Sequence, residues 1–340
     1  MAQVRPPDVS YGSDTHSLVW GYRFAPEQAP VSIDCSAAVE WLNTPRRDAS
    51  EFIWLHLSLS NAAAERWMHE SLDLSDSFFE SLRESTGSTR LEVEGDALIA
   101  SIHDVLFNTS FDFANISTVT IWMEPRLVVS ARLRPLRSVD RLRAAIKSGQ
   151  PLRSSAELLA QLLREQAAVL VDIVRQSTGR VDDVEDTLLA NRVSVSRGEL
   201  SEQRRSLVRL QRLLAPEPAS LFRLLNRPPV WLSEDDLRDL RQAAEELSAA
   251  VADCAALTER IKLLQEELAA SVEEQTNRTL FILTVVTVLA LPINVVTGLL
   301  GMNVGGIPLQ QHANGFAWVV GALSLVTLVL AYLLLIRRGD

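Results

Sequence analysis

Cysteine and histidine are both scarce in this chain. Its 340 residues include two cysteines, Cys35 and Cys254, and five histidines. The cysteines lie far apart and have the spacing of neither a metal site nor a redox pair, so a reducing compartment is expected. The histidines are scattered along the chain, which gives no fixed zinc cage of the kind that needs several Cys or His ligands together.

Charge is missing from two long stretches near the end of the chain. Residues 279–300 and 316–336 contain no charged side chain over 22 and 21 positions. An apolar run of about 20 residues is long enough to cross a bilayer as a helix. Joined by a short loop, the two runs predict a membrane hairpin that follows a large aqueous domain.

Acidic residues outnumber basic ones in the part that precedes the hairpin. Beyond residue 278 only Arg337, Arg338 and Asp340 are charged, which leaves 42 acidic and 31 basic residues, a net charge of −11, in residues 1–278. Such a balance argues against a nucleic-acid partner. It suits a cation, and it equally fits the solubility of an ordinary acidic cytoplasmic domain.

Basic residues flank the hairpin only at its outer ends. Arg278 precedes the first run and Arg337 and Arg338 follow the second, whereas the connecting loop, residues 304–315, has no charge. The positive-inside rule then places residues 1–278 and both termini in the cytoplasm. The first residues of the chain lack the apolar core of a signal peptide, which agrees with this orientation.

Strand and helix patterns alternate over residues 1–137 and predict one cytoplasmic α/β domain. Residues 138–232 lose the strand signal and are expected to be helical, with Pro216 and Pro218 stopping one of the helices. Strands are expected at 17–24, 52–57, 98–107, 118–123 and 126–131. Helices are expected at 36–42, 62–72, 77–84, 139–147, 154–189 and 199–214.

Proline and glycine are both absent from the 62 residues between Pro229 and Pro292. Ser233, followed by three carboxylates, is a strong helix start. We therefore expect one helix from about 234 to about 300, about 100 Å long at 1.5 Å per residue. Its stalk, residues 233–278, carries a heptad-like apolar seam that packs against helices of the same chain or against another subunit.

Another face of the same helix continues into the membrane with a spacing of three or four residues. Asn294 is costly inside an apolar span if it faces lipid, so this face must meet water or another helix. Since one hairpin cannot enclose a pore, an ion path needs several copies around an axis. Interhelical hydrogen bonding by Asn294 is the alternative.

The expected pore-lining residues are Leu280, Leu283, Thr287, Leu291, Asn294 and Gly298. Toward the cytoplasm the same face continues through Glu266, Glu273 and Thr276. In an oligomer these residues would form acid rings around the ion path; the alternative is that they are ordinary solvated residues of the stalk.

A Gly-Met-Asn sequence, residues 301–303, follows the first run directly. An asparagine oxygen there could contact the water shell of a hydrated cation. Together with Pro292, the stalk and the second run, this motif makes the chain resemble the CorA-type two-transmembrane Gly-x-Asn metal-ion transporters. Residues 304–308 (Val-Gly-Gly-Ile-Pro) look like those of the zinc-transporting branch, ZntB.

The resemblance implies a funnel-shaped homopentamer in the bacterial inner membrane. Residues 279–303 would line the pore, 316–336 would face lipid and 337–340 would form a cytoplasmic tail. Gly301, Met302 and Asn303 would form the selectivity mouth, where Asn303 meets the hydrated ion. His312 in the outer loop is a further possible contact for Zn²⁺ or a proton, and an ordinary exposed histidine is the alternative.

The function implied by the resemblance is transport of Zn²⁺, coupled to protons, with no bound cofactor. A Mg²⁺ or Co²⁺ channel of the same architecture is the nearest alternative. A membrane-anchored coiled-coil sensor or scaffold is disfavoured, because an anchor needs neither Asn294 nor the Gly-Met-Asn loop. An enzyme is not expected, since the chain has no phosphate-binding loop with lysine, no metal-spaced His pair and no nucleophile elbow.

Overall fold

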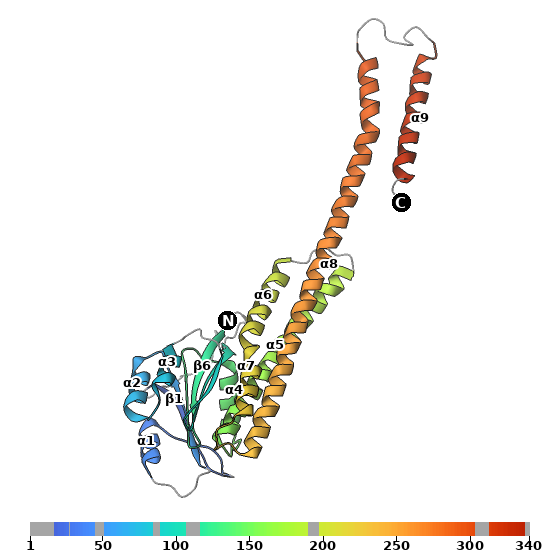
Figure 1. The fold of residues 1–340 in the computed structure, drawn as a ribbon. Helices are drawn as coiled ribbons and strands as arrows, with labels where there is room; N and C mark the ends of the chain where they lie inside the picture. The colour runs from blue at the N-terminus through green and yellow to red at the C-terminus, as the bar shows by residue number, and fades with distance from the viewer. Residues whose placement is uncertain are drawn as a thin grey trace, which may run out of the picture. The chain divides into compact units, whose positions relative to one another are not determined.

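The structure is a computed structural model that describes residues 17–26, 28–44, 51–83, 89–106, 116–189, 197–302 and 313–336. The chain forms two compact units, Met1–Leu263 and Leu264–Asp340. A single helix, α8 (Glu234–Leu300), contributes to both of them (Figure 1). The prediction of one continuous helix from the stalk to the end of the first apolar run is thereby confirmed.

The first unit is built on a seven-stranded sheet of order β2-β1-β3-β7-β6-β5-β4. Neighbouring strands are antiparallel except for β3 and β7, which are parallel. The five strands expected from the sequence are confirmed. The strands are β1 (Leu18–Phe24), β2 (Val31–Ser32), β3 (Phe52–Ser58), β4 (Arg90–Glu94), β5 (Ala97–Val105), β6 (Ile116–Met123) and β7 (Leu127–Arg132).

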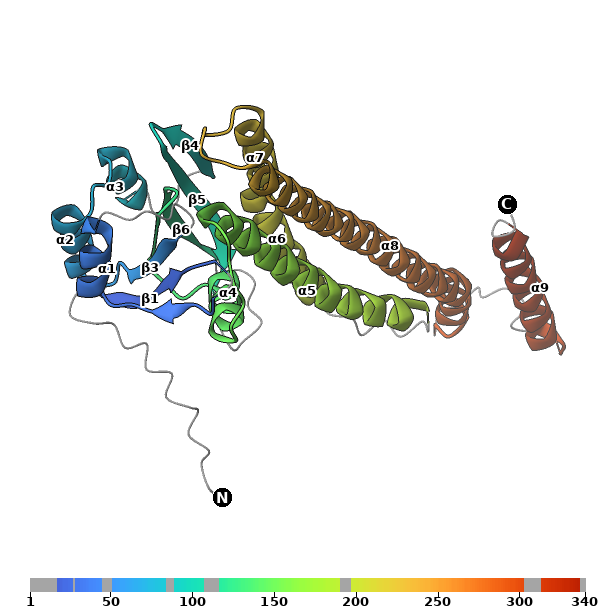
Figure 2. The same ribbon diagram turned by 90° about the horizontal axis from the view of Figure 1, so that it is seen from below.

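Helices cover both faces of this sheet (Figure 2). One face carries the three short helices α1 to α3, and the helices α4 to α7 lie on the other side. The first set is α1 (Cys35–Asn43), α2 (Ala62–Ser71) and α3 (Asp76–Arg83). The second set begins with α4 (Arg137–Lys147), α5 (Ser155–Leu189), α6 (Arg197–Leu214) and α7 (Pro216–Asn226).

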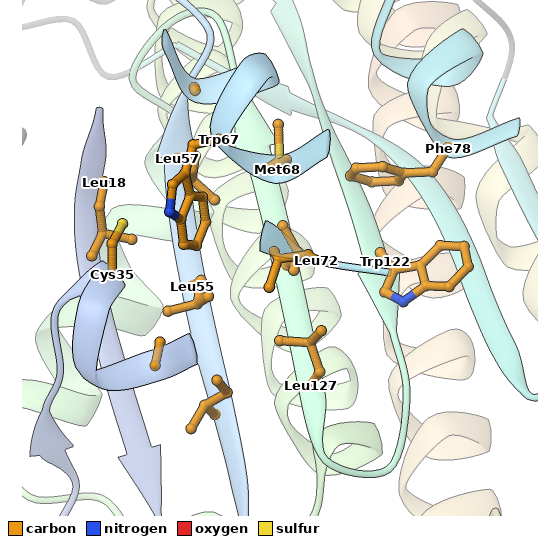
Figure 3. Close-up of a cluster of buried hydrophobic side chains, with 14 of the residues drawn as sticks. Leu18, Cys35, Leu55, Leu57, Trp67, Met68, Leu72, Phe78, Trp122 and Leu127 are labelled. Carbon is orange, nitrogen blue, oxygen red and sulfur yellow. The ribbon is translucent and has the colours of Figure 1, made fainter. Parts of the chain in front are cut away.

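An apolar core fills the space between the sheet and α1 to α3 (Figure 3). Leu55 and Leu57 of β3 are fully buried in it, as is Met68 of α2. Phe78 of α3 meets Trp122 of β6 edge-on, with 6.0 Å between ring centroids. Burial of this many large side chains gives the unit its own hydrophobic stabilisation.

Side-chain caps fix where several helices begin. Asp34 accepts a hydrogen bond of 2.8 Å from the backbone nitrogen of Ala37 at the start of α1. At the start of α8, Ser233 Oγ accepts from the Asp236 nitrogen and the Asp236 carboxylate accepts from the Ser233 nitrogen, both at 3.1 Å. This reciprocal pair is a capping box, and it confirms the predicted start of the long helix.

Pro216 and Pro218 begin a helix, which the sequence analysis did not predict. They lie in the first turn of α7, directly after the end of α6. A proline fits the first turn because the backbone nitrogens there have no partner within the helix. Reading these residues only as the end of a helix was therefore incomplete.

A buried polar cluster joins the sheet to α5 and α7. Glu217 of α7 accepts from the His103 backbone nitrogen at 2.7 Å and from Gln166 of α5 at 2.6 Å. Burial raises the pKa of the Glu217 carboxyl, and hydrogen bonds from His103 oppose that rise. These bonds hold the helical layer on the sheet, because a buried carboxylate without partners would be strongly unfavourable.

A second buried carboxylate joins the sheet to α4. Asp104 of β5 accepts hydrogen bonds from the Ser138 backbone nitrogen at 2.8 Å and from the Ser138 hydroxyl at 2.5 Å. Burial raises the pKa of Asp104 to about 6, although the Ser138 bonds favour its charged form.

Candidate ion-conducting site

The first part of α8 packs within its own chain. Leu240, Ala244, Leu247, Cys254 and Ile261 of the predicted seam are fully buried in the first unit. The thiol of Cys254 points to the carbonyl oxygen of Leu207 in α6 at 3.7 Å. The seam was expected to pack either within the chain or against another subunit. From Leu240 to Ile261, it packs within the chain.

Ion pairs attach the same part of α8 to α5. Arg260 of α8 donates to Asp182 at 2.7 Å and also contacts Glu185. Near the start of the helix, Asp239 binds Arg164 of α5 at 3.3 Å and pairs with Arg153 as well. These pairs join α8 to the rest of the first unit at two levels, in addition to the apolar packing of the seam.

In the second unit, α8 and α9 (Gly315–Ile336) form the predicted hairpin. Both helices are long and apolar enough to cross a membrane. An apolar groove of about 480 Å³ lies between them. Pro292 and Val296 of α8 and Trp318 and Ala322 of α9 are among its lining residues. The groove shows which side of α8 is turned toward α9.

Asn294 lies on the opposite side of α8 from that groove. Residues two positions apart are separated by about 160° around an α-helix. Both Pro292 and Val296 are two positions from Asn294, so the predicted stripe points away from α9. All six predicted pore-lining residues are exposed in the single chain: Leu280, Leu283, Thr287, Leu291, Asn294 and Gly298.

The polar groups of this stripe differ in how they are satisfied. The hydroxyl of Thr287 donates to the Leu283 carbonyl oxygen at 2.9 Å. Its oxygen can still accept a bond from outside the helix. The side-chain amide of Asn294 has no hydrogen bond to any residue that the structure describes. A free amide in an apolar span demands water, an ion or another helix.

Thr297 is a polar neighbour of Asn294 that the sequence analysis did not select. Its hydroxyl donates to the carbonyl oxygens of Ile293 and Asn294, at 2.8 and 3.2 Å. The side chain is exposed and lies one turn beyond Asn294. The spacing of three residues was the signal that could have identified it.

At its C-terminal end the stripe reaches the Gly-Met-Asn motif. The backbone nitrogen of Gly301 donates to the Thr297 carbonyl oxygen at 2.9 Å, and a Cβ at this glycine would lie 3.0 Å from that oxygen. Glycine therefore suits the tight end of α8. Met302 is exposed beside it. Asn303 and His312 lie outside the described residues, as does most of the outer loop.

The end of the stripe that precedes the apolar run consists of exposed residues of α8. Glu266, Glu273 and Thr276 are all exposed in the single chain. The hydroxyl of Thr276 donates back to the Val272 carbonyl oxygen at 2.8 Å. Among the residues that the structure describes, no three Asp, Glu, His or Cys side chains are grouped so that they could hold a metal ion. Within the described part of one chain, Glu266 and Glu273 are therefore not part of a group of three or more such ligands.

Comparison with known proteins places this hairpin and sheet in one family. The model of the family described as CorA-like Mg²⁺ transporter protein matches residues 49–338. This chain belongs to that family. Its members are transporters, so the chain is a divalent-cation transporter of the CorA type, and the two apolar helices are its membrane-spanning segments.

Two curated relatives cover most of this CorA-like chain. A protein named divalent cation transporter CmaX, from Pseudomonas aeruginosa, is 30% identical over 271 residues, which are 78% of this chain and 81% of the relative. A zinc transport protein ZntB from Pectobacterium atrosepticum is 27% identical over 266 residues, or 77% and 80% of the two chains.

Solved structures show the same architecture. Full-length CmaX aligns with a TM-score of 0.81 at 25% identity, covering 94% of this chain and 98% of that one. The CorA magnesium transporter of Methanocaldococcus jannaschii aligns with a TM-score of 0.76 at 18% identity, again covering 94% and 98%. The predicted fold class, an N-terminal α/β domain followed by a long helix and two C-terminal apolar helices, is confirmed.

Proposed function

We propose that this chain forms a homopentamer that moves Zn²⁺ across the bacterial inner membrane along an axis lined by α8. The exposed Asn294 face, turned away from α9, is the observation that carries this proposal. In a ring of chains with α8 inside and α9 outside, that face meets water instead of lipid. The amide of Asn294 then binds the water shell of the passing ion.

The proposed path has three levels. Gly301, Met302 and Asn303 form the outer mouth, with Asn303 contacting the hydrated ion and His312 as a possible neighbour in the loop. Below the mouth, the leucines of the stripe form constrictions that close by excluding water. Glu266 and Glu273 would concentrate cations at the cytoplasmic end.

Flux through reconstituted liposomes tests the proposal. Asn303→Ala is expected to abolish Zn²⁺ uptake while leaving the size of the oligomer unchanged in detergent. Val320→Ala, an exposed α9 residue on the expected lipid side, serves as the matched control and should retain uptake. Uptake by Asn303→Ala at the wild-type rate would contradict the assignment of the mouth.

The choice of Zn²⁺ rests on the ZntB relatives and on the loop at residues 304–308. Mg²⁺ is the second candidate, because the family description names it and because the CmaX relative is named only for divalent cations. Competition between labelled Zn²⁺ and a large excess of Mg²⁺ separates the two. Zn²⁺ uptake that persists in excess Mg²⁺ supports the proposal, and its loss supports the alternative.

Proton coupling is the most specific part of the proposal. Residues 279–300 contain no Asp, Glu or His, so a coupling group must lie elsewhere, for example at Glu273 in the stalk. We expect an imposed pH gradient to accelerate Zn²⁺ uptake in wild-type liposomes. The acceleration should disappear in Glu273→Gln if that carboxylate carries the proton, whereas a rate independent of the gradient in the wild type would remove coupling altogether.

A further inference from the structure

The apolar groove between α8 and α9 has no part in the proposed ion path, because it lies on the side of α8 opposite Asn294. Its wall is formed by α8 residues between Pro292 and Leu300 and by α9 residues between Trp318 and Val326. Both stretches belong to the second unit and to the membrane-spanning segments, which run side by side there (Figure 1). A groove with hydrocarbon walls inside a bilayer is filled by hydrocarbon and not by water.

The length of the groove matches one leaflet of the membrane. From Pro292 to Leu300, α8 rises by about 12 Å at 1.5 Å per residue. The hydrocarbon of one leaflet is about 15 Å thick, which is half of the bilayer value of about 30 Å. Leu300 is the last residue of α8, whereas Pro292 lies near the middle of the uncharged run 279–300. The groove therefore begins near one membrane surface and ends near the mid-plane, as an extended lipid chain does.

Trp318 marks the end of the groove that lies at the membrane surface. It stands in the first turn of α9, which begins at Gly315, and it is exposed in the single chain. Tryptophan is enriched at membrane–water interfaces, where its ring lies at the level of the lipid headgroups and its N–H meets polar groups. The other residues of the wall are aliphatic. A polar end at the surface and an aliphatic end at the mid-plane are also the two ends of a phospholipid.

The sizes of the side chains favour a lipid over a helix of another copy. Contacts between helices in membranes are rich in Gly, Ala, Ser and Thr, because small residues let the backbones approach. On the groove side α8 presents proline, valine and leucine side chains instead. Its small and hydroxyl residues in this stretch, Thr297 and Gly298, lie outside the groove and are exposed near Asn294. The Asn294 side therefore suits contact with other copies, and the groove side suits a flexible hydrocarbon chain.

We propose that the groove binds one acyl chain of a phospholipid in each copy of the chain. The headgroup lies beside Trp318, and the end of the acyl chain lies near Pro292. Ala322 is the smallest residue of the wall, so the wall is lowest at its position. The bound lipid packs against the back of α8 and supports this helix from the side opposite Asn294. The inference needs only the membrane hairpin and does not depend on which ion is carried.

Retention of lipid by the purified full-length protein tests the site. The protein is reconstituted with phosphatidylcholine that is brominated along its acyl chains, extracted again in maltoside detergent and freed of loose lipid by gel filtration. Bromine quenches nearby indoles, and Trp318 is the only tryptophan beyond residue 264. We expect an equimolar amount of phospholipid to stay bound and to quench Trp318, and Trp318→Phe should lose the quenching.

Ala322→Phe fills the groove and should lose most of the retained phospholipid together with the quenching. Ala322→Leu is a milder variant of the same kind, in case the larger ring prevents assembly. Leu328→Phe is the matched control, because Leu328 is an exposed residue of α9 outside the groove. It should retain phospholipid like the wild type.

A photoreactive benzoylphenylalanine in place of Val319, which lines the groove, detects the other possible occupant. Cross-linking to phospholipid is expected. Cross-linked pairs of chains would show that another copy covers the groove, and this result would overturn the proposal. It is also overturned if the wild type retains far less than an equimolar amount of phospholipid, or if both Ala322 variants retain as much as the wild type. None of these results depends on ion flux, so they leave the proposed transport function unaffected.

Discussion

The two units of this chain satisfy their apolar residues in different ways. In the first unit, large side chains such as Trp54 and Leu55 are buried within the chain. In the second, Leu283 and Leu291 of α8 are each 62% exposed, and Tyr332 of α9 is 65% exposed. An apolar surface of this kind is stable only when lipid or other protein covers it. The first unit therefore has a core of its own, whereas the second depends on lipid or on other protein to cover its apolar surface.

The comparison also separates two roles of one helix. Up to Ile261, the apolar side of α8 is buried and its charges pair with α5. Beyond residue 279, the same helix has no charge and exposes leucines. A substitution should thus affect mainly folding in one half and mainly assembly or flux in the other.

The largest expected effect on folding is in the core of the first unit. Leu55→Ala should reduce the free energy of unfolding by about 2–5 kcal/mol, because it removes a fully buried side chain. Leu283→Ala should leave it unchanged within about 0.5 kcal/mol. Urea unfolding in detergent, followed by tryptophan fluorescence, reports mainly on the first unit, since six of the seven tryptophans precede residue 264. Equal losses of unfolding free energy in both variants would contradict the proposed difference between the two units.

The next largest effect is expected at Glu217, which joins the sheet to α7. Glu217→Leu should cost about 3 kcal/mol, since it leaves the donors of His103 and Gln166 without an acceptor in a buried place. Glu217→Gln keeps an acceptor oxygen and is the matched control, with a smaller expected loss. If both variants unfold at the same urea concentration, hydrogen bonding by this side chain does not hold the helical layer.

The patterns that predicted the fold are local ones. Alternating and continuous apolar runs identified the five main strands, and the stretch without proline or glycine identified α8. The edge strand β4 was missed because its sequence, Arg-Leu-Glu-Val-Glu, is mostly charged and suits an exposed edge. α7 was missed because its prolines were taken as a stop and not as a first turn.

The candidate site was predictable only in part. Spacing along one helix was enough to group Leu283, Thr287 and Asn294 on a common face. It could not show that α9 packs against the other face, because nothing in a three-to-four spacing identifies the partner. Contacts between segments far apart in the sequence could not be predicted from local patterns either. His103 and Glu217, which are joined by a hydrogen bond, are 114 residues apart. A cavity beside Thr120 of β6 forms only because α2 and α3 lie next to that strand.

A smaller and pH-dependent effect is expected at Asp104. Its pKa is about 6 in the fold, against an ordinary value of 3.8. The folded state therefore binds its proton more tightly, so this carboxyl adds stability below about pH 4 that is lost as the pH rises through about 6. The full pKa shift corresponds to about 3 kcal/mol, of which about 2 kcal/mol is expressed between pH 4 and pH 7. His56, whose pKa is lowered well below 6.5 by burial, acts in the opposite direction.

Asp104→Asn isolates the contribution of this carboxyl, because His56 is present in both proteins. The difference in unfolding free energy between wild type and variant should change by about 2 kcal/mol between pH 4 and pH 7, in favour of the wild type at the acidic end. Unfolding curves at half-unit pH steps measure it. A difference that stays constant over this range would show that Asp104 does not titrate there.

The smallest expected effect is at the attachment of the stalk. Arg260 pairs with Asp182 and Glu185, but its side chain is 39% exposed. Ion pairs at such positions contribute about 1 kcal/mol or less. Arg260→Gln should thus lower the free energy of unfolding by less than about 1 kcal/mol, and the loss should shrink in 1 M salt. Arg238→Gln, at the more exposed pair with Asp235, is the control and should cost still less. A loss of unfolding free energy above about 2 kcal/mol at Arg260 would mean that ion pairs hold α8 in the first unit more than the buried seam does. The first half of the helix would then differ from the second mainly in its charge pairing and not in its apolar burial.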